Sequence, residues 1–493
     1  MLTFLERLAE AVSTFFQTYL EPVAEFLEGY VWSWPPDWPL LAVVLLGTGL
    51  FVTVRLAFVQ VRGFKHAIDI TRGKYDNPED AGDLKHYQAL TTALSATVGI
   101  GNIAGVAIAI RMGGPGALFW MWVTAFFGMA LKFAECTLAL KYRKVHADGS
   151  VSGGPMYYIE MGLKDRGFGN WKWMAMTFAA LAAICSFGSG NMNQSNTMAV
   201  QMEGAFHIPR VVTALIFAAV VAAVIIGGIK RIGRVTSILA PAMALLYVVG
   251  ALIILLINVK EIPSGLALIV TQAFAPESLV GGGVASFLLT LMWGIRRGLF
   301  SNEAGQGSAP IAHATAKTTE PVREGLVASL GPFIDTLVIC TMTGLVVVTS
   351  GAYKDKVEQS LAAVTAHEAV VAGSSVTDSD LSSLREARQA GSITVRDGAL
   401  QGAHLVHFDA LVEDARLFDG AGNPWNGSLS LAADGTLSVE GDAPTVIGRA
   451  LHSGAELTSW GFEKGLGAWG KLIVSLAVLL FAVSTAISWS YYG

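Results

Sequence analysis

Charged residues are scarce in this 493-residue chain: Asp, Glu, Lys and Arg make up 14% of it, whereas hydrophobic residues make up 53%. Soluble domains carry about a quarter charged residues, so the composition excludes an ordinary soluble domain and indicates a membrane protein. The formal net charge of -5 also excludes a strongly basic surface, and with it a nucleic-acid partner.

Cysteine is rare as well. Cys136, Cys185 and Cys340 each lie within an apolar run and lack metal-ligand spacing, so they indicate small apolar core residues and exclude a disulfide framework. The N-terminal stretch lacks a basic region and a small-residue cleavage site, so no signal peptide is expected. Residues 1–38 are instead expected to form an amphipathic segment at a membrane surface.

Long apolar runs dominate the rest of the chain and predict about nine membrane spans. These spans are expected near residues 39–60, 88–111, 116–141, 171–201, 211–229, 234–258, 284–311, 325–350 and 466–489. Lys and Arg gather in the loops after the first, third, fifth and seventh spans, which places those loops in the cytoplasm. The N-terminus and the segment before the last span are then extracytoplasmic, in a multi-pass protein of the bacterial inner (plasma) membrane.

The segment 351–464 differs in composition from the spans around it. It is polar and acidic, and its short alternating runs are separated by Gly, Asp and Asn, which predicts β-hairpins. His404 and His407 have no third ligand at metal-binding spacing, so exposed strand histidines are expected. The domain prediction is therefore an N-terminal segment, a transmembrane core at 39–350 continued at 465–493, and a β-rich extracytoplasmic insertion between them.

The stretch TVGIGNIAG, Thr97 to Gly105, places three glycines inside a membrane-length apolar run. A dinucleotide site is excluded, because no strand precedes the glycines and no acid follows about twenty positions on. Close helix packing through the pair Gly101 and Gly105 stays open. A broken helix is the third interpretation: it would offer N–H groups to a carboxylate and carbonyl groups to a cation.

A second break is expected five spans later, because transporters with broken helices are built from repeats. The span 284–311 contains five helix-breaking residues: Gly294, Gly298, Gly305, Gly307 and Pro310. This spacing predicts two five-helix halves preceded by one extra helix.

Four segments carry a family resemblance: GIGNIAGVAIAI, GGPGALFWMWVTAFFGMALKFAE, GGPMYYI and GIRRGLFSNEAGQGSAPIAHATAKT. They resemble the alanine or glycine:cation symporter family, sodium:alanine symporter-like members of the amino acid–polyamine–organocation superfamily. The likeness covers about residues 35–350 and resumes at GAELTSWG. It implies an all-α polytopic membrane protein with the leucine-transporter fold, a core of two inverted repeats. It also implies symport of a small neutral amino acid, such as alanine or glycine, with sodium or a proton, and no other cofactor.

The resemblance further implies two sets of site residues. The substrate set is Thr97, Gly99, Gly101, Asn102, Gln194, Trp293, Gly294 and Ile295, the last three in an unwound segment of the seventh span. The sodium set is Ser95, Val98, Ser484 and Thr485. Two alternatives stay open: an interhelical hydrogen bond for the buried amide of Gln194, and hydroxyls that only bond back to their own helix for the Ser–Thr pair.

Charged residues within the spans have structural alternatives too. Lys132 and Glu135 are three residues apart and are expected to pair along one helix face. Arg296 or Arg297 is expected to neutralise Glu303 or to gate the cytoplasmic path. Asp335 is the best candidate for a proton relay.

Two departures from the family pattern favour a different function class. Family members continue with two more membrane helices after SWSYYG, so a truncated product or a partner that supplies those helices is expected. The insertion of about a hundred residues is the second departure; it could bind substrate, dock a partner or be an insertion tolerated at an exposed loop, and the last is favoured. Both favour a non-transporting amino-acid sensor as the alternative to a symporter. No catalytic constellation stands out, so an enzyme is not expected.

Overall fold

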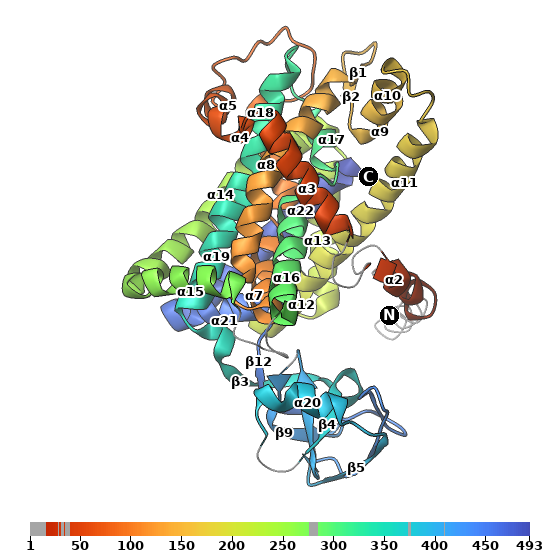
Figure 1. The fold of residues 1–493 in the computed structure, drawn as a ribbon, viewed down its shortest axis with the longest axis vertical. Coiled ribbons are helices and arrows are strands. Elements are labelled where there is room, and N and C mark those ends of the chain that lie inside the picture. Colours follow the sequence, from red (N-terminus) through yellow and green to blue (C-terminus); the bar gives the residue numbers. More distant parts are fainter. Residues whose placement is uncertain are drawn as a thin grey trace.

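The computed structural model describes residues 16–27, 29–30, 34, 40–275, 284–372, 376–408 and 410–493. It consists of a long helical bundle and a smaller β-rich part at one end of it (Figure 1). We call that end the insertion end and the opposite end the far end. The predicted segment 1–38 falls largely outside the described residues, apart from α2 (Glu21–Leu27) and a few flanking residues.

The bundle helices follow the predicted spans in order. They are α3 (Leu40–Arg55), α6 (His86–Thr97) with α7 (Val106–Gly113), α8 (Ala117–Lys141), α11 (Lys172–Phe187) with α12 (Asn193–Phe206), α13 (Arg210–Ile225), α14 (Gly228–Ile257), α16 (Val284–Asn302) with α17 (Ala309–His313), α18 (Pro321–Pro332) with α19 (Thr341–Thr349), and α22 (Ala468–Tyr492). Among the described residues, five continuous helices are long and apolar enough to cross a membrane, or six with the bent pair α6–α7. The total of nine spans stays a prediction.

Shorter helices connect these elements. They are α4 (Val59–Arg62), α5 (Phe64–Thr71), α9 (Pro155–Tyr157), α10 (Leu163–Asp165), α15 (Ile262–Phe274) and α21 (Gly454–Leu466). The pattern of spans did not predict α15, which follows α14 and packs against α8 and α19. Turns of π-helix join α6 to α7 and α18 to α19, at Gly101–Gly105 and Phe333–Cys340.

Helix α8 lies at the centre of the bundle and packs against α18, α16 and α3. Glycine permits the closest of these approaches. A methyl group on Gly325 of α18 would lie 2.0 Å from Thr137 Oγ1 and 2.7 Å from the carbonyl oxygen of Phe133, both on α8. Small residues at such crossings let membrane helices approach closely. Two of the three cysteines, Cys136 and Cys340, are buried as predicted, but Cys185 on α11 is exposed.

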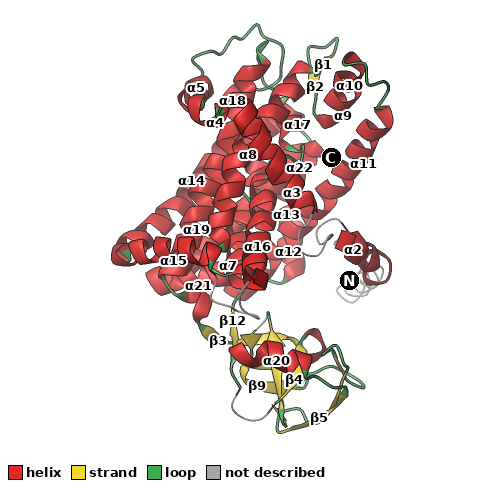
Figure 2. Ribbon diagram, in the orientation of Figure 1, coloured by secondary structure: helices red, strands yellow, loops and turns green. Residues whose placement is uncertain are grey.

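The predicted β-rich segment is present, and Figure 2 shows nearly all strands gathered in it. Its strands are β3 (Lys356–Ala363), β4 (Glu368–Val371), β5 (Gly391–Arg396), β6 (Ala399–Leu400), β7 (Ala403–His407), β8 (Ala410–Leu411), β9 (Glu413–Phe418), β10 (Gly427–Leu431), β11 (Leu437–Ser438) and β12 (Thr445–Leu451), with α20 (Leu381–Glu386) beside them. They form antiparallel sheets in the orders β11-β10-β5-β6-β9-β12-β3 and β4-β7-β8. A separate hairpin, β1 (Lys144–Val145) with β2 (Val151–Ser152), follows α8.

The insertion leaves the bundle and returns to it at the same place. The first strand β3 pairs with the last strand β12, so that Lys356 lies opposite Leu451. Just outside this pair, Asp355 accepts hydrogen bonds from Lys464 Nζ at 2.7 Å and from Trp460 Nε1 at 3.1 Å. The chain therefore enters and leaves the insertion through a two-stranded neck fastened to α21.

The contact between α8 and α18 gives a test of the packing. We expect Gly325→Ala to lower the thermal midpoint of the detergent-purified protein, because overpacking costs about 1–3 kcal/mol. The matched control is Gly331→Ala on the same helix, where an added methyl group meets nothing within 4 Å. Equal midpoints for both variants, measured by tryptophan fluorescence, would contradict the close approach.

Candidate functional site

The first predicted helix break is present between α6 and α7. Helix α6 ends at Thr97, Val98 has the non-helical angles φ -75 and ψ 90, and the two half-helices are bent by 53°. The N–H of Gly99 donates to Asn102 Oδ1 at 2.8 Å, and the N–H of Ile100 donates to Gln194 Oε1 at 3.4 Å. Because these two donors turn away, the carbonyl groups of the preceding turn, including that of Ser95, lose their usual helical partners.

Asn102 ties this break to the second half of the chain. Its side chain is fully buried, and its Nδ2 donates to Asp335 Oδ1 at 2.5 Å and to Ser301 Oγ at 3.2 Å. The hydroxyl of Thr343 donates to the Asn102 carbonyl oxygen at 2.8 Å. The asparagine thus holds the π-helical turn against α16 and against the π-helical segment after α18.

Asp335 is saturated with hydrogen bonds. Its Oδ2 accepts from Ser301 Oγ at 2.8 Å and from Thr336 Oγ1 at 2.7 Å, in addition to the bond from Asn102 to Oδ1. Several donors make a buried carboxylate compatible with an apolar interior. Its predicted role as a proton relay stays a prediction.

Lys132 provides the positive charge for this interior. It is almost fully buried on α8, and it attracts the carboxylates of Glu135, Glu303 and Asp335. Glu135 accepts a hydrogen bond from the N–H of Gly305 at 3.4 Å. The charge of Lys132 therefore acts on all three acids, and its expected direct pair with Glu135 stays a prediction.

Glu303 has partners other than an arginine. Its Oε2 accepts from Ser308 Oγ at 2.5 Å and its Oε1 from Trp489 Nε1 at 3.1 Å. Arg297 instead lies over the rings of Trp293 and Phe300, 5.4 and 6.0 Å from their centroids.

The second break lies about ten residues later than expected. The expectation that Trp293, Gly294 and Ile295 are unwound is wrong, because α16 is helical through Asn302. A methyl group on Gly294 would lie 2.5 Å from the Ala117 carbonyl oxygen, so this glycine permits contact with α8. The interruption occurs at residues 303–308, where Glu303, Gly305 and Gly307 have φ of 52, 82 and 80. Glycine adopts these angles without steric cost.

The predicted substrate residues therefore fall into two groups. Thr97, Gly99, Gly101, Asn102 and Gln194 surround the first break. Of the other three, Gly294 contacts α8, Ile295 packs with Ala42 of α3, and Trp293 lines a cavity at the insertion end.

The predicted sodium residues lie where α6 packs against α22. A methyl group on Gly99 would come within 2.5 Å of Thr485 Oγ1. The hydroxyls of Ser95, Ser484 and Thr485 are buried, and none has a hydrogen-bond partner among the described residues. Ser488, one turn further along α22, is in the same state and was not predicted.

Back-bonding does not account for these hydroxyls. Ser490, on the same helix, donates to the Ile487 carbonyl oxygen at 2.6 Å, which is the ordinary solution for a serine in a membrane helix. Buried polar groups without partners are rare in folded proteins. Oxygen ligands of this kind suit a hard cation, so the donor set fits sodium.

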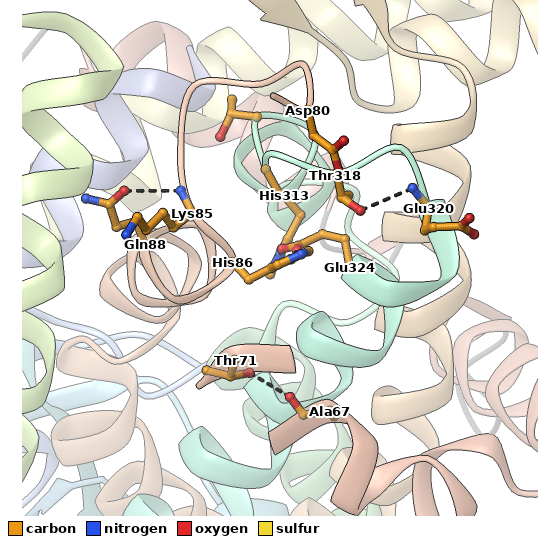
Figure 3. A network of polar contacts seen from close by, with 12 residues as sticks. Ala67, Thr71, Asp80, Lys85, His86, Gln88, His313, Thr318, Glu320 and Glu324 are labelled. Atoms are coloured by element: carbon orange, nitrogen blue, oxygen red, sulfur yellow. Dashed lines mark hydrogen bonds and ion pairs between the residues drawn. The ribbon is translucent and has the colours of Figure 1, made fainter. Parts of the chain in front are cut away.

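A buried His–Glu–His cluster at the far end was missed by the sequence analysis (Figure 3). Glu324 at the start of α18 bonds His86 Nδ1 of α6 through Oε2, and His313 Nδ1 of α17 through Oε1 at 2.5 Å. All three side chains are at most 1% exposed. The cluster joins the outer ends of both broken helices to one carboxylate.

Arg143 adds further hydrogen bonds that hold the far end of the bundle together. Its guanidinium donates to the carbonyl oxygens of Ala81, Ala314, Ala316 and Thr318 at 2.6–2.9 Å. These carbonyls belong to the segments that precede α6 and follow α17. The far end is therefore fastened by side chains from α6, α17 and α18 together with Arg143, which follows α8.

We expect Glu324→Gln to lower the thermal midpoint markedly, because the neutral amide leaves two buried histidines without their carboxylate. A lost charged hydrogen bond costs about 1.5–3 kcal/mol. The matched control is Glu320→Gln, an exposed carboxylate at the start of the same helix, with an expected change within about 0.5 kcal/mol. A midpoint for Glu324→Gln equal to that of the control would show that the cluster does not stabilise the closed far end.

Comparison with known proteins supplies the family context. The model of the sodium:alanine symporter family matches residues 17–377 and 439–493. The chain is 47% identical over 325 residues to the sodium/alanine symporter AgcS of Methanococcus maripaludis, covering 66% of this chain and 70% of that protein. It is 42% identical over 339 residues to the probable sodium/glutamine symporter GlnT of Bacillus subtilis, covering 68% and 67%. The amino-acid carrier protein AlsT of the same organism is 42% identical over 311 residues, covering 63% and 64%.

Proposed function

Because the chain belongs to the sodium:alanine symporter family, we propose that it moves alanine or glycine across the membrane together with sodium. The protein is a membrane-embedded, sodium-coupled amino-acid symporter and not an enzyme. The proposal concerns which amino acid it carries, where substrate and ion bind, and how the chain is oriented.

The group of unpartnered hydroxyls beside the first break carries the proposal for the ion. Ser95, Ser484 and Thr485 would supply oxygen ligands, and the carbonyl of Val98 would complete the site from the broken end of α6. Bound sodium would satisfy groups that have no partner among the described residues, so it stabilises the arrangement of α6 against α22. Sodium binding thereby favours the conformation in which the break is formed.

The substrate would bind next to this ion. Its carboxylate would compete with Gln194 Oε1 for the N–H of Ile100, a hydrogen bond that is long at 3.4 Å. The dipole of the second half-helix favours a negative group at that position. Asn102 keeps the break open for the substrate, since its own side chain is engaged by Gly99, Ser301 and Asp335.

We further propose the leucine-transporter arrangement and the orientation expected from the charged loops. The two interrupted helices, α6–α7 and α16–α17, would be equivalent members of inverted repeats. The direct bond from Asn102 to Ser301 supports this, because it joins the two interrupted helices to each other. The far end would face the cytoplasm, and the insertion would lie outside.

Uptake of radiolabelled alanine into proteoliposomes tests the function. We expect accumulation driven by an imposed sodium gradient and lost in Asn102→Ala, whose break has lost its central hydrogen bonds. Substrate binding without accumulation under either a sodium or a proton gradient would contradict transport and would favour the sensor. Accumulation under the proton gradient alone would contradict the sodium site.

The ion site has its own matched comparison. We expect Ser484→Ala with Thr485→Val to raise the sodium concentration for half-maximal uptake by roughly tenfold or more, because each lost ligand weakens binding. Ser490→Ala is the control on the same helix, since its hydroxyl bonds only to its own backbone. An unchanged sodium dependence in the double variant would overturn the site assignment.

A further inference from the structure

A cavity of about 410 Å³ lies between the bundle and the insertion. This volume is within the range of small-molecule sites, about 300–1,000 Å³. Three elements of the bundle line it, α7, α16 and the start of α21, together with strands of the insertion. The lining side chains used below are Ile108, Trp293, Arg297, Gln359, His407 and Glu456.

Arg297 is the cation of this cavity. The structure pairs its guanidinium with the faces of Trp293 and Phe300, and records no hydrogen bond or ion pair for it among the described residues. Stacking on aromatic rings fixes a guanidinium and leaves its N–H groups in the ring plane available to a carboxylate. The side chain also borders the first break, since a methyl group on Gly105 would lie 3.9 Å from Arg297 Cδ. Arg297 therefore lines the cavity and also lies near the π-helical turn that follows the first break.

Glu456, at the start of α21, is the acidic side chain that lines the same cavity. Its side chain is 58% exposed and lies 3.6 Å from His452 Nδ1 on the segment before α21. A half-exposed carboxylate retains acceptor sites for an ammonium group. The cavity thus has one positive and one negative group, which is the charge pattern of a free amino acid.

The insertion supplies the remaining wall and keeps it in place. The guanidinium of Arg111 on α7 donates to the carbonyl oxygen of Phe408, next to His407. The expectation that His407 is an exposed strand histidine is wrong. The ring of His407 is half-buried against His367, with 3.3 Å between their Nδ1 atoms. Burial and the neighbouring His367 and Arg111 lower the pKa of His407 to about 4. At neutral pH His407 is therefore uncharged, and among the described side chains that line the cavity Arg297 and Glu456 carry the charges.

We propose that this cavity is an outer binding site for the transported amino acid, with the carboxylate on Arg297 and the ammonium group on Glu456. The inference rests on the proposed function and extends it: the β-rich insertion forms one wall of a capture site on the path to the first break. Gln359 of β3 lines this wall; its Nε2 donates to the Ala450 carbonyl oxygen at 3.0 Å, which turns its amide oxygen to the role of acceptor for the same ligand. The arrangement favours zwitterions over simple anions or cations, because a ligand with one charge leaves one of the two groups unpaired.

Transport kinetics separate this role from a structural one. We expect Arg297→Gln to raise the half-saturating external alanine concentration about tenfold, with a maximal rate within about twofold of wild type. Glu456→Gln should act in the same direction, and Arg297→Lys, which keeps the charge, should lie between. A matched control on the insertion is Arg396→Gln, an exposed arginine of β5 outside the cavity lining.

Equilibrium binding gives a second readout that needs no transport. Wild-type protein in detergent should bind two equivalents of radiolabelled alanine, and Arg297→Gln and Glu456→Gln one. One equivalent in wild type, or unchanged external half-saturation in both variants, would overturn the outer site. A fall in maximal rate alone would overturn it too, by assigning Arg297 to the packing of α16. If the wild-type protein fails to accumulate alanine, the proposed function is refuted. That result leaves the outer site open to test, because the binding stoichiometry does not depend on transport.

Discussion

The bundle depends on one physical constraint: a helix broken within a membrane must find partners for the backbone groups it releases. Asn102 meets much of this demand. Its side chain accepts from the Gly99 N–H and donates to Asp335 and Ser301, while its carbonyl accepts from Thr343. The hydroxyls near the same break have no such partner among the described residues, so the proposed ion would gain the most by binding there.

The two ends of the bundle are closed differently. At the far end, Glu324 and Arg143 bond the segments around α6, α17 and α18 directly to one another. At the insertion end, the helices border a cavity in which Arg297 has only aromatic partners among the described residues. Opening the far end costs buried charged hydrogen bonds, whereas a ligand can enter the insertion end by replacing solvent. Transport between the two ends would therefore require the energy of ion and substrate binding at the break.

Sequence alone predicted the features that depend on local pattern. Apolar length gave the position of each bundle helix, TVGIGNIAG located the first break, and Gly-, Asp- and Asn-rich punctuation identified the β-rich segment. The sequence misplaced the second helix break, because glycine serves two purposes in this span. Gly294 permits contact with α8, while Gly305 and Gly307 adopt positive φ. The His86–Glu324–His313 cluster could not be predicted, since its members are separated by up to 238 residues and meet only in the fold.

The insertion shows how a β-rich segment can be added to a helical bundle without disturbing the packing of its helices. Because β3 and β12 pair along the neck, the insertion of about a hundred residues leaves the bundle and returns to it at adjacent points. Closing so long a loop costs conformational entropy, and the pairing of strands within the insertion offsets this cost. Contacts at two places then fix its position: Lys464 and Trp460 with Asp355 at the neck, and Arg111 with Phe408 beside the cavity. The second contact joins α7, the half-helix that follows the break, to the insertion. Any movement of α7 must therefore move the insertion wall or break that bond, which would couple the cavity at the insertion end mechanically to the proposed site at the break.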